Sequence, residues 1–174
     1  MAKISRVGFG QVEPNHLSAQ RTAQIYAQLP CKKDIKILEN GQFVKYDYTN
    51  NEVNVTGNGE WMLVFNEVKL YGDFYAETYK DFALQAKNFT EEVMTPRVFK
   101  TNIGDIYTTN AIGGANTTKD AEYTGIDVSE GDILSPGADG WLAPGAKTDT
   151  CAWEVVKIYT MADGQPAVKL MRIN

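Results

Sequence analysis

Acidic residues beside tryptophan are the best candidates for acid–base chemistry in this chain. Glu60 precedes Trp61, Glu154 follows Trp153, and Glu67 lies a few residues after the first pair. An aromatic wall can raise the pKa of a carboxyl group, and a glycosidase needs only two carboxylates at a defined separation. A small carboxylate-dependent hydrolase is therefore one hypothesis. No cleft signature accompanies these acids, and we expect a protein that is not an enzyme.

Other catalytic and ligand-binding patterns are weak. His16 is the only histidine, and a histidine mechanism would need a positioned nucleophile and an orienting group. Neither Cys31 nor Cys151 has a second cysteine or a histidine at chelating spacing, which argues against zinc. The segment 8–10 lacks the third glycine of a dinucleotide loop. The sequence therefore predicts no catalytic residue, no metal and no cofactor.

Composition limits the partners. The chain has 174 residues, 43% of them hydrophobic, which is enough for one substantial core. Its formal net charge is -5 and its pI is about 4.9, so no general positive field attracts nucleic acid or an anionic membrane surface. The first residues lack the pattern of a secretory signal, which predicts synthesis in a cytoplasm. There, Cys31 and Cys151 are expected as reduced, packed thiols, although one bridge between them stays open.

The N-terminal section differs from the rest of the chain in composition and in the elements that it predicts. Residues 1–15 carry Gly8, Gly10 and Pro14 among apolar side chains and predict an extended arm. Residues 17–29 are rich in alanine and glutamine and stop at Pro30, which predicts a short helix. We therefore divide the chain into an arm and helix at 1–30 and a single β-rich domain at 31–174.

Strand signals dominate that domain. A glycine, a polar residue and an apolar pair recur at 41–44, 104–107 and 131–134, and each predicts a turn that leads into a strand. Residues 61–65 form a continuous apolar run, which predicts a central strand covered on both faces. The expected fold is mainly β, an antiparallel β-barrel or sandwich with an extended N-terminal arm and one or two short helices.

Three further segments carry specific expectations. Residues 73–88 favour a helix slightly over extended chain, within a section, 73–99, of ambiguous pattern. Residues 110–120 are small, polar and glycine-rich, which predicts a mobile surface excursion that weakly subdivides the domain. Residues 162–165 predict a hairpin turn between two strands that place the following side chains on one face: Val156, Ile158, Val168 and Leu170.

Residues 131–145 also resemble part of a known group of proteins. Their Gly-Asp strand followed by a Gly-Ala-Asp-Gly turn is similar to the small β-barrel segments of tailed-bacteriophage head decoration (auxiliary capsid) proteins, and residues 62–71 and 12–18 have the texture of phage virion proteins. The resemblance implies a non-enzymatic protein, made in the host cytoplasm, that binds the capsid exterior and stabilises it. Its partner would be the major capsid protein, with a homo-oligomer on the capsid surface and no role for nucleic acid or membrane.

Within this hypothesis the arm supplies the contacts. We expect deletion of residues 1–12 to leave a folded protein that no longer binds its assembly. The alternative is a glycan- or receptor-binding module of a phage fibre or spike, in which Trp141, placed near the surface by its turn, stacks on sugar rings. The expected partner-binding residues are Lys3, Ile4, Arg6, Val7, Phe9, Gln11, His16 and Trp141.

Overall fold

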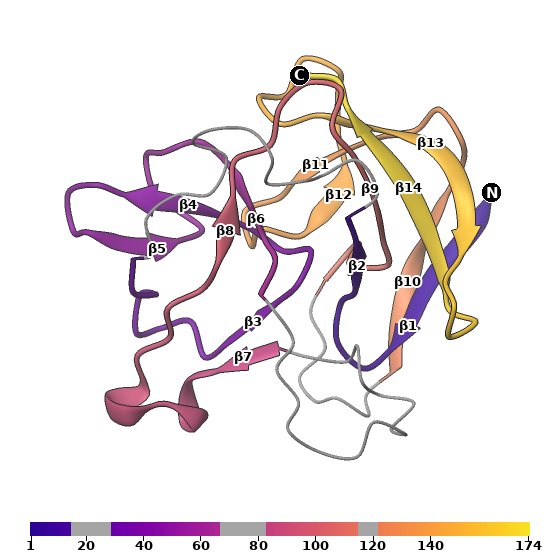
Figure 1. Cartoon of the computed structure of the whole chain (residues 1–174). Coiled ribbons are helices and arrows are strands. Elements are labelled where there is room, and N and C mark those ends of the chain that lie inside the picture. The colour runs from indigo at the N-terminus through magenta and orange to yellow at the C-terminus, as the bar shows by residue number, and fades with distance from the viewer. Residues whose placement is uncertain (15–28, 67–82, 115–121) are drawn as a thin grey trace.

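The computed structural model describes residues 1–14, 29–66, 83–114 and 122–174, and it is built mainly from antiparallel strands in a sandwich-like arrangement (Figure 1). This confirms the predicted fold class. The strands are β1 (Ala2–Val7), β2 (Val12–Glu13), β3 (Ile37–Glu39), β4 (Phe43–Asp47), β5 (Glu52–Asn54), β6 (Met62–Val64), β7 (Ala83–Gln85), β8 (Val98–Phe99), β9 (Ile106–Thr109), β10 (Glu122–Val128), β11 (Ile133–Pro136), β12 (Leu142–Pro144), β13 (Trp153–Thr160) and β14 (Pro166–Arg172). Two short 3-10 helices, η1 (Ala86–Asn88) and η2 (Thr90–Glu92), follow β7.

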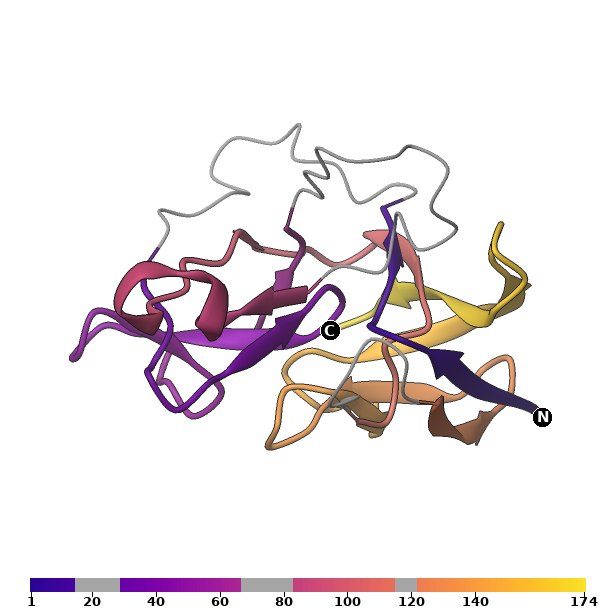
Figure 2. The same ribbon diagram turned by 90° about the horizontal axis from the view of Figure 1, so that it is seen from below.

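The strands group into two lobes that lie side by side (Figures 1 and 2). The terminal lobe contains a six-stranded sheet in the order β12-β11-β13-β14-β9-β2 and the two-stranded ribbon β1-β10. The middle lobe contains a four-stranded sheet in the order β5-β4-β6-β8 and the pair β3-β7. Both ends of the chain lie in the terminal lobe, so the middle lobe is formed by chain between β2 and β9. In space, residues 1–13 thus belong with the C-terminal strands.

Strands β4 and β6 serve both lobes. Phe43 and Leu63 are buried in the core of the terminal lobe, whereas Val44, Met62 and Val64 are buried in the core of the middle lobe. Successive side chains of a strand point to opposite faces, so one short run supplies two cores. This explains why residues 61–65 are apolar at every position and confirms the prediction of a central strand covered on both faces.

Aromatic rings fill the core of the terminal lobe. The Trp153 ring meets Tyr107 edge to face, with 4.8 Å between ring centroids, and lies 5.9 Å from Phe43 at a tilted angle. Trp153, Tyr107 and Phe43 are each fully buried. Such pairs add stabilisation beyond the area that the rings bury. Burial also raises the pKa of the Tyr107 hydroxyl well above its ordinary value.

The C-terminal hairpin forms as predicted but carries an irregularity. Strands β13 and β14 pair from Trp153 and Arg172 to Thr160 and Pro166, with a register shift between Val155 and Lys157. Val155 faces the core in regular alternation with Trp153, and the β-bulge after it leaves Val156 37% exposed while Ile158 comes opposite Val168. The prediction that Val156 shares a face with Val168 and Leu170 is therefore wrong, because strict alternation does not survive a bulge.

Two other expectations need correction. Asn110, Ala111 and Ile112 are fully buried, so the predicted surface excursion is wrong at the start of 110–120, and 115–120 lies outside the described residues. The helix predicted over 73–88 is wrong at 83–88, where strand β7 and helix η1 stand instead. Residues 73–82 of that helix, and nearly all of the helix predicted at 17–29, lie outside the described residues. None of the described helices is long and apolar enough to span a bilayer.

Each lobe buries one cysteine. Cys31 lies in the core of the middle lobe and Cys151 in that of the terminal lobe, and both are free thiols, as predicted. Burial is the main cause that raises the pKa of Cys31, to about 12, and it raises the pKa of Cys151 as well. At neutral pH both groups are therefore protonated and packed.

Candidate functional site

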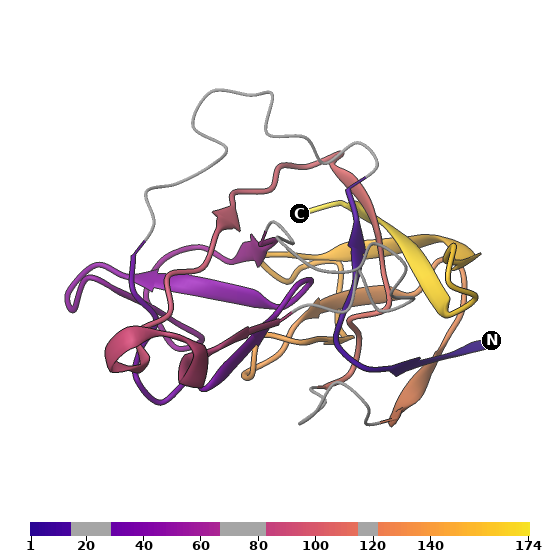
Figure 3. The ribbon, with the colours of Figure 1, turned by 60° about the horizontal axis from the view of Figure 1, so that its bottom comes forward.

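The N-terminal residues are part of the fold. Strand β1 pairs antiparallel with β10 from Ala2 and Val128 to Val7 and Glu122, with a bulge between Ile4 and Arg6 (Figure 3). Ile4 is fully buried in the core of the terminal lobe. Strand β2 then joins the edge of the six-stranded sheet beside β9. These residues are extended, as predicted, but they pair within the fold and do not form an arm that stands apart from it.

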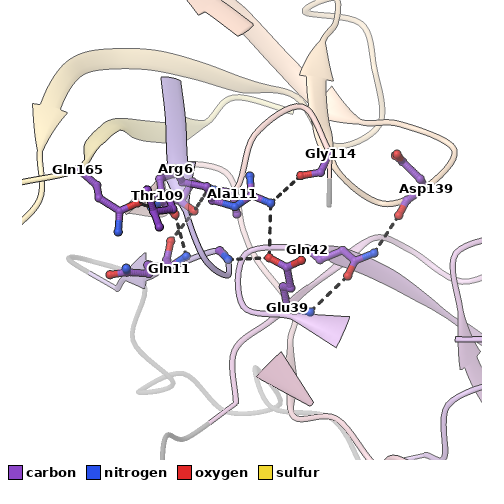
Figure 4. A network of polar contacts seen from close by, with 12 residues as sticks. Arg6, Gln11, Glu39, Gln42, Thr109, Ala111, Gly114, Asp139 and Gln165 are labelled. Atoms are coloured by element: carbon purple, nitrogen blue, oxygen red, sulfur yellow. Dashed lines mark hydrogen bonds and ion pairs between the residues drawn. The ribbon is translucent and has the colours of Figure 1, made fainter. Parts of the chain in front are cut away.

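A buried ion pair connects this strand to the middle lobe (Figure 4). The Arg6 Nη2 atom lies 3.4 Å from Glu39 Oε2, and both side chains are at most 1% exposed. The same nitrogen donates a hydrogen bond to the Gly114 carbonyl oxygen at 2.6 Å, and Glu39 Oε2 accepts one from Gly10 N at 2.6 Å. The Arg6 guanidinium carbon also lies 4.8 Å from the centroid of the Trp141 ring. Charge, hydrogen bonding and a cation–π contact thus meet at one point between the lobes.

The turn before Trp141 is fixed to the middle lobe as well. Phe43 N donates to the Gly140 carbonyl oxygen at 2.7 Å, and Gln42 Nε2 donates to the Asp139 carbonyl oxygen at 3.0 Å. Gly140 has φ +80°, and a Cβ atom there would lie 2.0 Å from the Phe43 oxygen, so glycine is required. Trp141 is consequently only 2% exposed. Its predicted surface position is wrong.

A second polar network holds Gln11 against the tip of the C-terminal hairpin. Gln11 N donates to Asn110 Oδ1 at 2.8 Å, and Gln11 Nε2 donates to Asp163 Oδ2 at 2.8 Å. Val7 N donates to Gln165 Oε1 at 3.0 Å. Desolvation opposes ionisation of Asp163, but hydrogen bonds from Gln165 and Gln11 outweigh it and lower the pKa of the carboxyl group. These bonds fix the chain on both sides of residues 8–10.

The structure separates the predicted contact residues into two classes. Lys3 and Val7 are exposed on β1, with Val7 57% exposed. The buried ones are Ile4, Arg6, Phe9, Gln11 and Trp141, and His16 lies outside the described residues. Sequence reasoning missed Glu39, the partner of Arg6, because a carboxylate before Asn40 and Gly41 has the pattern of an exposed turn. The only available signal was its position directly after the apolar pair 37–38.

The acids singled out for hydrolysis do not form a described catalytic group. Glu60 forms an ion pair with Lys100, Glu154 lies on β13 beside Ile133 of β11, and Glu67 lies outside the described residues. In the described ranges, no group of three or more histidine, cysteine or acidic side chains is placed to hold a metal ion. Comparisons with protein-family models, curated proteins and solved structures gave no match for this chain. Functional inference therefore rests on its own residues.

The outer edge of β1 is the remaining candidate site. Among the described strands, β1 pairs with β10 alone; β14 lies beside its C-terminal end, where Val7 N donates to Gln165 Oε1, and the side chains of Lys3 and Val7 are exposed. Inward-facing Ile4 and Arg6 hold the strand in place. An edge strand offers backbone hydrogen-bonding groups to a strand of another chain. This edge is therefore suited to a protein partner.

Proposed function

We propose that this protein is a non-enzymatic virion structural protein that binds the outside of a bacteriophage capsid and stabilises it. The observation that carries the proposal is that, among the described strands, β1 pairs with β10 alone, while its Lys3 and Val7 side chains are exposed and Ile4 and Arg6 on its other face are buried. A strand that is already ordered loses little conformational entropy on pairing with a capsid strand. The contact then comes from a rigid edge, with Lys3 and Val7 as the exposed side chains.

The segment that resembles decoration proteins supports the same proposal. Residues 131–145 form the hairpin of β11 and β12, with Leu134 opposite Pro144 and Pro136 opposite Leu142. Its turn is bonded to Gln42 and Phe43 of the middle lobe. A body whose two lobes are connected in this way resists deformation. Resistance to deformation is what a protein needs in order to reinforce a shell under internal pressure.

The binding partner is the major capsid protein, and several copies of this chain, as a homo-oligomer, occupy symmetry-related positions on the capsid exterior after synthesis in the host cytoplasm. The net charge of -5 disfavours DNA as the ligand. Pairing at a sheet edge is directional, so the number of copies bound is set by the number of equivalent edges on the shell.

The test is a pelleting experiment with capsids that lack the protein. We expect binding to saturate at a symmetry-related copy number and to increase the resistance of the capsid to heat. Val7→Asp and Lys3→Glu change exposed side chains of β1 and are expected to weaken binding without unfolding the protein. Ile103→Asp is the matched control, because Ile103 is also an exposed apolar residue, at 68%. It lies far from Val7 along β14: the adjacent Gly104 bonds to Arg172 at one end of this strand, whereas Val7 bonds to Gln165 in the hairpin tip at the other end.

Two results would contradict the proposal. Absence of saturable binding to capsids, with the wild-type protein folded, would remove the capsid function. Equal loss of binding in Val7→Asp and Ile103→Asp would mean that β1 is not the contact edge. A glycan-binding module in which Trp141 stacks on sugar rings is disfavoured, because that ring is buried against Arg6.

A further inference from the structure

We propose that a pocket beside Trp61 binds a neutral carbohydrate. The pocket has a volume of about 420 Å³, within the range of roughly 300–1,000 Å³ that is usual for small-ligand sites. It lies where the two lobes meet, because Trp61 directly precedes β6 and the other lining residues come from β11 and from the loop before β13. Its lining comprises Trp61, Ser135, Pro136 and residues 148–151. This inference does not depend on capsid binding.

Asp149 is a fixed hydrogen-bond acceptor in this pocket. Its Oδ2 atom accepts hydrogen bonds from Ala146 N and from Ser135 Oγ, each at 2.8 Å. The backbone hydrogen bond, followed by that from Ser135, lowers the pKa of Asp149, so the group is ionised at neutral pH. In the described part of the chain these side-chain bonds use Oδ2, which leaves Oδ1 to accept from a hydroxyl group of a ligand.

A glycine makes this arrangement possible. A Cβ atom at Gly145 would lie 2.1 Å from Ser135 Oγ and 2.8 Å from Asp149 Oδ2. Any other residue would therefore push the loop away from β11 and separate the carboxylate from the serine. The close approach shows that the acceptor is held by backbone geometry, as binding groups in a preformed site are.

Trp61 supplies the aromatic wall. Lys45 Nζ lies 4.4 Å from the centroid of its ring, and part of the indole packs against the core of the terminal lobe. The side chain is thus held in place while it stays partly exposed at the pocket. Because Lys45 covers one face of the ring, the sugar contacts the part of the indole that borders the pocket, and it does so through its C–H groups, the apolar part of the sugar ring.

The lining selects among ligand classes. An anion would be repelled by the ionised Asp149, and an apolar ligand would desolvate this carboxylate without giving its Oδ1 atom a hydrogen bond. A neutral sugar carries no negative charge, and its hydroxyl groups can donate to Asp149 and form hydrogen bonds with Ser135. Thr148 and Thr150 offer further hydrogen bonds at the exposed rim of the pocket. The chemistry that fits is therefore an uncharged polyhydroxylated ring.

Tryptophan fluorescence gives a selective test. Trp141 is 2% exposed and Trp153 is fully buried, so Trp61 is the tryptophan that a soluble quencher reaches. The probes are the methyl glycosides of glucose, galactose, mannose and N-acetylglucosamine, titrated into the full chain. We expect at least one to change the fluorescence saturably and to protect it from acrylamide quenching. No saturable change with any of the four would overturn the proposal.

Two variants assign the site. Trp61→Phe keeps an aromatic ring against the core, and Asp149→Asn keeps the shape of the side chain but replaces one acceptor with a donor. Each is expected to weaken the glycoside by about tenfold, measured by ligand-observed NMR, which equals about 1.4 kcal/mol. Asp47→Asn is the matched control, because Asp47 also accepts hydrogen bonds from its own turn, at Thr49 and Asn50, outside the pocket. Unchanged affinity in Trp61→Phe and Asp149→Asn, with both variants folded, would place the binding elsewhere and overturn the assignment.

Discussion

The terminal and middle lobes are built by different means. In the terminal lobe, β13 and β14 have 8 and 7 residues and pair along nearly their whole length around an aromatic core. In the middle lobe the longest strand, β4, has 5 residues and β8 has 2, and the core is largely aliphatic and thioether side chains. Short ladders supply few hydrogen bonds and little cross-strand packing. The stability of the middle lobe therefore depends on its contacts with the terminal lobe.

The shared elements follow one direction of dependence. Phe43 and Leu63 extend from the middle lobe into the core of the terminal lobe, and Glu39 meets Arg6 at the junction. No described side chain of the terminal lobe enters the core of the middle lobe in return. Opening of the middle lobe would also withdraw Phe43 and Leu63 from the terminal core, but the longer ladders of the terminal lobe still make it the unit expected to be more stable, with the middle lobe opening first.

Deletion of residues 1–12 is the most severe test of this comparison. It removes β1, the buried Ile4 and the Arg6 contact to the middle lobe, and it exposes the inner edge of β10. We expect loss of the cooperative urea transition of the terminal lobe. This reverses the expectation from sequence, in which the same deletion left a folded protein. A deletion variant that unfolds cooperatively at the wild-type urea midpoint would show that β1 adds nothing to the core.

The junction is tested by Arg6→Met. The substitution removes the cation that faces Glu39 while the carboxylate stays buried, and loss of one partner of a buried pair costs about 3–5 kcal/mol. The double variant Arg6→Met with Glu39→Gln removes both charges and should recover most of this loss. Chemical denaturation of the two single variants and the double variant measures the coupling. Additive effects would contradict a direct interaction between the two side chains.

Substitutions of two adjacent residues of β6 allow the two cores to be compared directly. Leu63 and Met62 are both buried, one in each core, so truncation of each to alanine removes packing on opposite faces of the same strand. In a Trp61→Phe background, Leu63→Ala should cost about 2–5 kcal/mol when unfolding is followed by the fluorescence of Trp141 and Trp153, which lie in the terminal lobe. Met62→Ala should shift that signal less. Equal shifts would mean that the lobes unfold as one unit.

The features of the fold that local sequence patterns determine were predicted correctly. Turn glycines, the apolar run at 61–65 and the C-terminal hairpin identified an antiparallel β protein, because each depends on a few neighbouring residues. Strand β1 was missed because its inward positions include Arg6 while Val7 points outward. A charged residue inside and an apolar one outside reverse the usual alternation, and only the distant Glu39 and Trp141 make that reversal favourable.

The same reason explains the errors at Trp141 and at 110–112. Glycine-rich chain predicts exposure when no partner is known, yet these residues pack at the contact between segments far apart in the sequence. Gly140 bonds to Phe43, and Gln11 bonds to Asn110. The pocket beside Trp61 was hidden for this reason too, since Asp149 and Ser135 meet only through the close approach at Gly145. Contacts of this kind cannot be read from local composition.

The two free thiols measure the stability of each lobe separately. Cys31 is 6% exposed in the middle lobe and Cys151 is 1% exposed in the terminal lobe, where its sulfur accepts a hydrogen bond from Trp153 Nε1 at 3.3 Å. Since burial raises both pKa values, a thiol reagent reacts after the lobe has opened and the thiol can ionise. In the single-cysteine variants Cys151→Ala and Cys31→Ala, we expect Cys31 to react about tenfold faster than Cys151, a difference of about 1.4 kcal/mol in the free energy of opening. Labelling of an unfolded control at the same pH corrects for intrinsic reactivity. Identical rates would show that the middle lobe opens only together with the terminal lobe, and the direction of dependence between them would be lost.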